Sequence, residues 1–292
     1  TTNDVLGETN VVIGKLNGTG FIDGIPAIER NAYGGGEGGP VFGTTNITLN
    51  KCFIGYRHFD TKPTDDLDYI QVGSDYYQEK LHDETWTGDG TNRLYDSGCI
   101  FGGGYIDNSS VDISNVKMYG GHVRNALFGG GEIAAIGRGI INASGQDNSV
   151  RELQGIYKAG KATVELYEGN VHRNVFGGGR GYNNLGEGGT LYSDGYVFGQ
   201  TEVRVHGGTV GTAKELARQN GNVFGGGDIG YVYSAYEGKG EKAVGDENGK
   251  LYVGVKDGER YDNGWEGYYY AYKKGDDPYI PGTKPEDDDE NW

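Results

Sequence analysis

Cysteine, proline and long apolar runs are scarce in this sequence, and each shortage argues against a class of protein. The two cysteines, Cys52 and Cys99, are too few for a disulfide-scaffold protein or for a zinc ribbon, which needs two pairs of cysteines. Six prolines without a Gly-X-Y period exclude collagen. No apolar run approaches the roughly 18 residues that a transmembrane helix needs. We therefore expect no membrane insertion from this stretch of chain.

Positive charge is also in short supply. The chain carries 26 lysines and arginines against 42 aspartates and glutamates, so its formal net charge is −16. This excess repels nucleic-acid phosphates and anionic lipid, so we expect no nucleic-acid partner. Residues 285–292 contain an acidic run that we interpret as a solvated linker or tail. Because the sequence begins at Thr1 and has Met118 as its one methionine, we expect a piece of a longer precursor.

Glycine, in contrast, is abundant: 57 of the 292 residues, against a usual share of roughly 7%. Many of the glycines belong to an internal repeat, whose phrases ending in Phe-Gly-Gly-Gly occupy residues 116–131 and 164–179, with a third copy split between 203–210 and 222–227. Triple glycines follow an aromatic residue at five places: Tyr33, Phe101, Phe128, Phe176 and Phe224. A second phrase, Gly-x-Thr-x-Val or a close variant, recurs within residues 5–13, 41–49 and 197–205.

The repeat predicts short strands that stack on one another. Val203 and Val205 alternate with polar residues, as in a strand with one buried face, and Val164 occupies the place of Val203 in the preceding copy. Glycines bend the chain between strands, and one copy is too small to bury its own apolar face. We predict an all-β fold, a parallel β-helix (β-solenoid) of about seven or eight coils spaced about 4.8 Å apart. In it, Phe101, Phe128, Phe176 and Phe224 form one column.

A β-sandwich or propeller is the alternative fold. It is less consistent with the sequence, because two-residue Asn-Gly and Asp-Gly hairpin signals between alternating runs are few.

Three segments interrupt or follow the predicted solenoid of residues 1–230. An excursion at about 55–98 is too long for a structureless loop and indicates a small subdomain. A capping box at Thr212 and Glu215, followed by Asn220 and Gly221, predicts a short helix at about 212–220. Residues 231–284 are rich in tyrosine and are predicted to be a β-rich unit that closes the last coil.

Four residues preceding apolar pairs look equivalent from one copy to another: Cys52, Cys99, Asn174 and Asn222. The asparagines predict an inward amide ladder, with each amide bonded to its neighbours above and below. The cysteines then take the same place as small buried thiols. A disulfide between them is the alternative, but stacked parallel strands rarely give its geometry. Threonines also recur at one place, which period-two alternation directs inward: Thr9, Thr45, Thr163 and Thr201.

Motifs that carry chemistry are few. Gly-x-Gly-x-x-Gly occurs at 34–39 and 225–230, but strand-like or loop sequence follows, so we interpret both as corners of the repeat rather than a dinucleotide fingerprint. The chain has no P-loop, G-x-S-x-G or H-E-x-x-H motif. The histidines occupy different places in the repeat and predict no metal cluster: His58, His82, His122, His172 and His206. A solvated loop is our interpretation of His58 with Asp60 and of His82 with Asp83, with acid–base chemistry as the alternative.

The residues that follow each triple glycine are polar or charged: Glu37, Tyr105, Glu132, Arg180 and Asp228. If these corners stack, Arg180 lies near Glu132 or Asp228 in an exposed charge ladder. Calcium along this edge is the alternative, but the calcium β-roll motif is absent and Arg180 repels a cation. Asp65, Asp66 and Asp68 are a second weak calcium candidate. We therefore expect no cofactor.

The phrases Phe-Gly-Gly-Gly, Thr-x-Val-x-Val and Gly-Gly-x-Val resemble those of very large glycine-rich repeat proteins of gut Bacteroidales. More broadly, they are similar to right-handed parallel β-helices of bacterial adhesins and pectate-lyase-like proteins. The resemblance covers residues 5–230 apart from the excursion. It implies a right-handed coil, a location outside the cell or on a bacterial surface, and an adhesive or scaffold role. No lyase-type Asp, Lys and Arg set can be matched, so no catalytic residue is carried over.

We therefore expect a non-enzymatic extracellular rod that acts as a stalk, scaffold or adhesin, with a surface glycan or protein as partner. The alternative is recognition or degradation of a polysaccharide, with sugar rings stacked on aromatic side chains: Trp86, Trp265, Tyr268, Tyr269, Tyr270 and Tyr272. A third hypothesis is a filament subunit that self-associates through open coil ends.

Overall fold

The computed structural model describes residues 4–15, 25–64, 69–79, 97–106, 108–144, 150–181, 195–211 and 221–228, with residues 232–233, 244–245 and 251–252. Within these ranges every regular element is a strand, so the all-β prediction is confirmed. No helix in the described part is long and apolar enough to span a membrane. The helix expected at 212–220, the tail at 285–292 and most of 231–284 lie outside the described residues.

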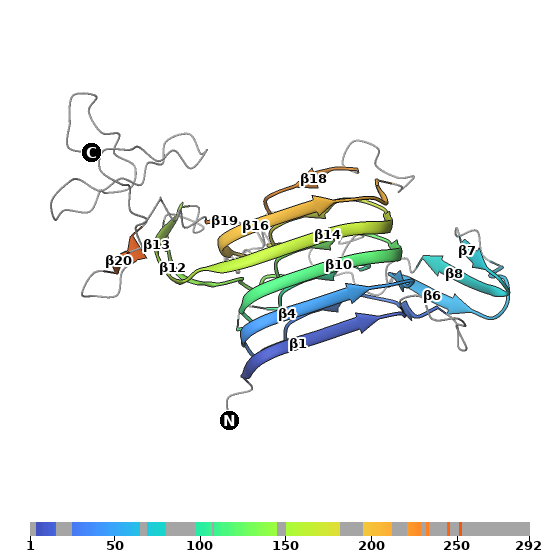
Figure 1. Ribbon diagram of the computed structural model, residues 1–292, viewed down its shortest axis with the longest axis horizontal. Helices are drawn as coiled ribbons and strands as arrows, with labels where there is room; N and C mark the ends of the chain where they lie inside the picture. The colour runs from blue at the N-terminus through green and yellow to red at the C-terminus, as the bar shows by residue number, and fades with distance from the viewer. Residues whose placement is uncertain are drawn as a thin grey trace.

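A nine-stranded parallel sheet forms one side of the molecule. Its six principal strands lie in the order β1 (Val5–Ile13), β4 (Val41–Leu49), β10 (Val111–Val123), β14 (Gly160–Val171), β16 (Val197–Val205) and β19 (Val232–Tyr233). Figure 1 shows the first five running side by side. Shorter strands extend the same sheet: β2 (Ala27–Ile28), β5 (Phe53–Ile54) and β17 (Thr209–Val210). The register places equivalent residues of the repeat together, as in Val116, Val164 and Val203.

A second parallel sheet consists of five two-residue strands. They are β3 (Ala32–Tyr33), β9 (Ile100–Phe101), β11 (Leu127–Phe128), β15 (Val175–Phe176) and β18 (Val223–Phe224), each paired with the next. Their aromatic rings stand in one column, as the spacing of the repeat predicts. The centroid separations from Tyr33 to Phe224 are 5.2, 4.8, 4.8 and 5.0 Å, and neighbouring rings are tilted by 14° or less.

The two sheets share a hydrophobic core. Ile47, Val116 and Val164 from the long strands lie in one buried cluster with Leu127 and Val175 from the short strands. Each of these side chains is at most 1% exposed. Burying one aliphatic side chain contributes roughly 1.5–3 kcal/mol, so a chain with few aliphatics gains most by concentrating them here.

The triple glycines allow the short strands to approach closely. A Cβ on the first glycine of a triplet, such as Gly102 or Gly129, would lie 2.4 Å from the carbonyl oxygen of the first glycine in the next triplet. Real Cβ atoms do not come this close to other atoms. These positions therefore require glycine because neighbouring short strands approach closely there, and not because the chain turns. The Gly-x-Gly-x-x-Gly motif at 34–39 leads directly into the strand β4, as expected for a corner of the repeat.

Among the described residues the large sheet has six principal strands and the second sheet five, fewer than the seven or eight coils expected. The reason is that excursions lengthen the units. The strands β6 (Tyr56–Phe59), β7 (Tyr69–Val72) and β8 (Asp75–Glu79) form a small antiparallel sheet between β5 and β9. We call this sheet the lateral insertion. An unforeseen hairpin, β12 (Arg138–Ser144) and β13 (Val150–Lys158), lies between β11 and β14, and β20 (Val244–Gly245) pairs with β21 (Leu251–Tyr252).

The predicted equivalence of the two cysteines is wrong. Cys99 directly precedes β9, as Asn174 precedes β15 and Asn222 precedes β18, whereas Cys52 precedes β5 in the other sheet. Two asparagines do bond as in a ladder: the side-chain amide of Asn222 donates to Oδ1 of Asn174 at 3.4 Å, and the Asn222 backbone N–H donates to the same atom at 3.0 Å. Both thiols are free and buried.

The inward threonine position forms a column of hydroxyl groups. Oγ1 of Thr9 donates to Gly34 O at 2.7 Å, and Oγ1 of Thr45 donates to Gly102 O at 2.6 Å. Ser114 continues the column. In β14 this place is taken by Ala162 rather than by Thr163, because the register pairs Ala162 with Thr201. The expectation for Thr163 is therefore wrong by one residue.

Candidate functional site

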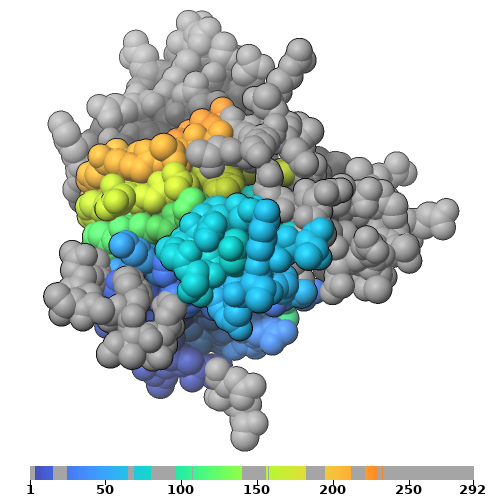
Figure 2. All heavy atoms as spheres, turned by 90° about the vertical axis from the view of Figure 1, so that its right-hand side faces the viewer, coloured from blue at the N-terminus to red at the C-terminus, as the bar shows by residue number. Residues whose placement is uncertain are grey.

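The lateral insertion packs on the side of the molecule through an aromatic cluster. Phe53 stacks on Tyr77 at a centroid distance of 4.0 Å, and its ring also stacks on His122 at 5.0 Å. Tyr56 meets Phe53 edge-on, and Phe53 of β5 is buried together with Tyr56 and Tyr77 of the insertion. The insertion lies beside the carboxyl ends of the long strands (Figure 1), and in the view onto that side it lies in front of the stacked strands (Figure 2). The packing of these rings therefore fixes the orientation of the insertion on the long strands.

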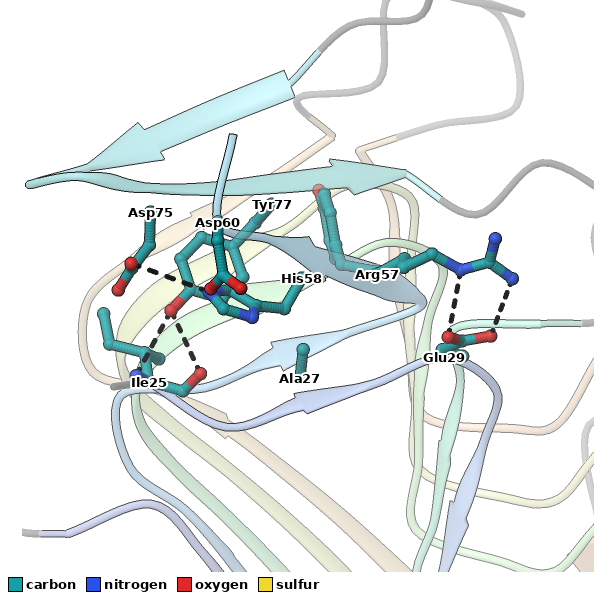
Figure 3. Close-up of a pocket in the computed structure, with 9 residues that line it drawn as sticks. Ile25, Ala27, Glu29, Arg57, His58, Asp60, Asp75 and Tyr77 are labelled. Atoms are coloured by element: carbon teal, nitrogen blue, oxygen red, sulfur yellow. Dashed lines mark hydrogen bonds and ion pairs between the residues drawn. The ribbon is translucent and has the colours of Figure 1, made fainter. Parts of the chain in front are cut away.

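A cavity of about 500 Å³ opens between the insertion and the strand β2. It is lined by residues of β2, β6 and β8 and by their flanking positions: Ile25, Ala27, Glu29, Tyr56, Arg57, His58, Asp60, Asp75 and Tyr77 (Figure 3). The Tyr77 hydroxyl bonds both to the backbone N–H of Ile25, at 3.2 Å, and to its carbonyl, at 3.1 Å. These bonds hold Tyr77, which lines the cavity, to the chain that precedes β2.

The two ends of the cavity carry different groups. At one end, the Arg57 guanidinium donates two hydrogen bonds to the Glu29 carboxylate, at 3.0 and 3.2 Å. At the other end, Nε2 of His58 lies 3.8 Å from Oδ1 of Asp60 and 3.7 Å from Oδ1 of Asp75. The ligand atoms of His58, Asp60 and Asp75 all lie within 4.8 Å of one another, which is compatible with a metal ion. Figure 3 shows the three converging.

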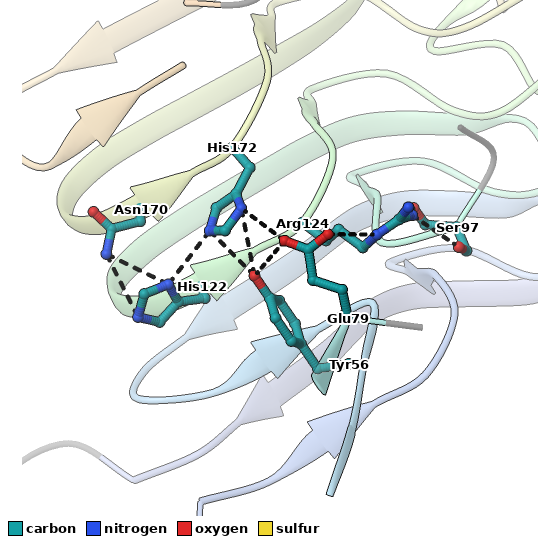
Figure 4. A network of polar contacts seen from close by, with 7 residues as sticks. All are labelled: Tyr56, Glu79, Ser97, His122, Arg124, Asn170 and His172. Atoms are coloured by element: carbon teal, nitrogen blue, oxygen red, sulfur yellow. Dashed lines mark hydrogen bonds and ion pairs between the residues drawn. The ribbon is translucent and has the colours of Figure 1, made fainter. Parts of the chain in front are cut away.

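A second polar cluster lies where the insertion meets the long strands (Figure 4). Nδ1 of His172 is 3.4 Å from Oε1 of Glu79, and Nε of Arg124 is 3.4 Å from Oε2 of the same carboxylate. Burial raises the pKa of Glu79, but the hydrogen bond and charge of His172 and the charge of Arg124 outweigh it, so the pKa lies below its ordinary value. The cluster thus joins β8 to the turns after β10 and β14.

Two histidines of this cluster lie side by side, although the sequence predicts no histidine ladder or metal cluster. Nδ1 of His122 lies 3.4 Å from Nε2 of His172, although the two residues occupy different places in the repeat. Burial, together with the neighbouring His172, lowers the pKa of His122 to about 4. His122 is therefore neutral near pH 7. The cluster serves to hold β8 against the turns after β10 and β14.

A third cluster lies beside the aromatic column. Nη2 of Arg180 and Oε1 of Glu132 form an ion pair at 2.6 Å, and the Tyr33 hydroxyl donates to Oε2 of Glu132. The predicted proximity of Arg180 and Glu132 is confirmed, but the expected exposure is wrong, because both side chains are less than 10% exposed. The guanidinium also lies over the ring of Phe101 at 5.0 Å and within 3.5 Å of Sγ of Cys99. Burial and the Glu132 charge raise the pKa of Tyr33.

The structure brings together only some of the residues singled out from the sequence. His58 and Asp60 meet, and Asp75 joins them without having been foreseen. The signal for Asp75 was present, because Gly73 and Ser74 between two apolar runs are a two-residue hairpin turn, which fixes β8 beside β7 and β6. The aromatic and acidic candidates elsewhere lie outside the described residues: Asp65, Asp66, Asp68, His82, Asp83, Trp86, Trp265, Tyr268, Tyr269, Tyr270 and Tyr272.

Comparison with known proteins assigns no family to this arrangement of residues. No family model, no curated protein and no solved structure matches the chain.

Proposed function

We propose that the repeated units are coils of a right-handed parallel β-solenoid, and that the chain is a non-enzymatic structural protein of a bacterial surface. The observation that carries this proposal is the aromatic column from Tyr33 to Phe224, in which one residue from each unit stacks on its counterpart. A column of this kind requires that the chain returns to the same place once in every unit. The core shared by the two parallel sheets supports the same winding.

A structural role follows from how the units hold together. Each unit covers the apolar face of the next, pairs with it along parallel strands, and aligns polar groups with it, as in the bond from Thr45 to Gly102. Such an array resists bending because every unit inside the stack is bonded to two neighbours. The excursions then extend from a stiff support, which suits contact with a surface glycan or protein. The extracellular location rests on the resemblance of the repeat phrases and on the acidic charge.

Single-molecule force spectroscopy tests the structural role. Chains tethered at both ends are expected to resist extension and then to lengthen in steps. Each step should match the chain between equivalent positions of neighbouring units, such as Thr9 to Thr45 or Ser114 to Ala162. Smooth extension at the force that stretches an unfolded chain would contradict the proposal. A glycan and matrix-protein array run on the same preparation tests the adhesive part, which fails if nothing binds.

End-to-end self-association is a second candidate, favoured by the exposed apolar residues at the two ends of the stack. On β1, whose one partner among the described strands is β4, Leu6 is 82% exposed and Val12 is 64% exposed. At the other end, Phe224 is 42% exposed, although its counterparts Phe101, Phe128 and Phe176 are buried. Unpaired strand edges of this kind pair with further chains. Light scattering across a concentration series should show growth that Leu6→Lys suppresses; a constant monomer mass would exclude it.

A further inference from the structure

We propose that His58, Asp60 and Asp75 bind one divalent transition-metal ion of the zinc type at the acidic end of the insertion cavity. The site is distinct from the repeat and needs only the lateral insertion. Its evidence is the placement of the three side chains, the charge that they leave uncompensated, and the open space beside them.

The placement follows from strand geometry. His58 and Asp60 are two positions apart in and just after β6, so they lie on the same face. The strands β6 and β8 are antiparallel, and the pairs His58 with Tyr77 and Phe59 with Tyr76 place Asp60, just after β6, close to Asp75 at the start of β8. The insertion therefore sets two carboxylates close to each other with an imidazole beside them (Figure 3).

The charge of the cluster is unfavourable without a cation. Like charges held close to each other repel. Among the described residues, His58 is the one ion-pair partner of both Asp60 and Asp75. The cavity's guanidinium group, on Arg57, is bonded to Glu29 at the other end. A bound divalent ion would remove the repulsion between the two aspartates.

The distances suit a small ion with nitrogen and oxygen ligands. Zinc binds histidine nitrogen and carboxylate oxygen at about 2.0–2.2 Å, so ligand atoms around one tetrahedral ion are about 3.4 Å apart. Nε2 of His58 lies 3.8 and 3.7 Å from the two carboxylates, and all three ligand atoms lie within 4.8 Å of one another, so side-chain rotations can bring them to that value. Calcium prefers six to eight oxygen ligands and gains little from an imidazole. The chemistry of the donor set therefore favours zinc over calcium.

Three protein ligands leave the fourth position of a tetrahedral ion open. His58, Asp60 and Asp75 all line a cavity of about 500 Å³, which is large enough to supply water or a small anionic ligand to that position. The arrangement is that of an accessible metal site rather than a closed structural one.

Isothermal titration calorimetry with zinc chloride tests the proposal on the full, metal-stripped chain. The titration contains millimolar calcium so that the many surface carboxylates are occupied. We expect one zinc ion per chain, bound at least tenfold more weakly by Asp60→Asn and by Asp75→Asn, and weakened further by His58→Ala. Asp60 is 92% exposed at its side chain, so its amide variant leaves the fold intact even if His58→Ala does not fold.

Two matched controls should bind zinc like the wild type. Glu29→Gln changes a carboxylate at the opposite end of the same cavity, and His206→Ala removes an exposed imidazole that stacks on Tyr167 away from the insertion. Circular dichroism of each zinc-free variant verifies folding. The proposal is overturned if wild-type protein binds no zinc under these conditions, or if Asp60→Asn and Asp75→Asn both bind it as tightly as the wild type does.

Discussion

At the scale of single residues, Glu132 and Arg180 form the most demanding contact, because both charges are buried beside the aromatic column. Removing one partner of a buried ion pair strands the other charge and typically costs about 3–5 kcal/mol, whereas replacing both by apolar residues is often neutral. We expect Arg180→Met to destabilise the protein by about that amount, and Glu132→Leu combined with Arg180→Met to recover most of it. Urea unfolding measures the free energies; equal losses in the single and double variants would contradict the prediction.

The two thiols give a second prediction at this scale. Burial raises the pKa of Cys52 to about 12 and also raises the pKa of Cys99, so little thiolate forms near neutral pH. Neither thiol should react with a disulfide reagent in the folded protein at pH 8, and both should react after denaturation. Absorbance of the released thiolate counts them. Rapid reaction of either one without denaturant would show that its surroundings open to solvent.

His122 gives a pH dependence whose sign follows from its lowered pKa. In the unfolded chain its pKa is near 6.5, whereas in the folded protein it is about 4, so the unfolded state binds the proton first as pH falls. Stability should therefore decline between about pH 6.5 and pH 4, by roughly 2 kcal/mol after allowance for partial solvation of the ring. Thermal unfolding of wild type and His122→Gln across this range measures the effect, and identical pH slopes would contradict it. The lowered pKa of Glu79 acts separately, below its ordinary pKa of 4.5.

At the scale of the strand and its neighbours, glycine at the start of each triplet determines how closely units approach. Gly129 leaves no room for a Cβ, whereas Gly225, at the same place in its own triplet, has no atom within 4 Å of that position. We expect Gly129→Ala to destabilise the protein by about 1–3 kcal/mol through overpacking and Gly225→Ala to have little effect. Denaturant midpoints of the two variants provide the comparison, and equal midpoints would argue against close stacking.

The sequence predicts the contacts between repeated units better than it predicts those of the lateral insertion. The Phe column and the Arg180–Glu132 contact were predictable because repeated phrases encode their own parallel register, so equal places in the phrase become neighbours. Cys52 was misplaced because an apolar pair before a glycine occurs in both sheets. The cavity was not predicted, because its residues come from an antiparallel insertion whose register is specified by a turn at Gly73 and by packing on Phe53 rather than by repetition.

At the scale of the whole molecule, a row of outward polar side chains runs across the long strands, one from each strand, and shows that the repeated units are in register. The amide of Asn46 donates to Asn10 at 3.1 Å, and that of Asn115 donates to Asn46 at 2.9 Å. Thr163 and then Glu202 continue this row across the next two strands. These residues are far apart in the sequence, so their spacing depends entirely on successive units lying in register.

Double electron–electron resonance between spin labels at Asn10→Cys and Glu202→Cys measures that alignment. The native thiols are buried and stay unlabelled, so the two introduced cysteines alone carry labels. Four strand spacings of about 4.8 Å place the two backbones about 19 Å apart, so a narrow distribution near this distance, widened only by the label arms, is expected. A broad distribution centred well beyond about twice that distance would show that the units do not stack as one continuous winding.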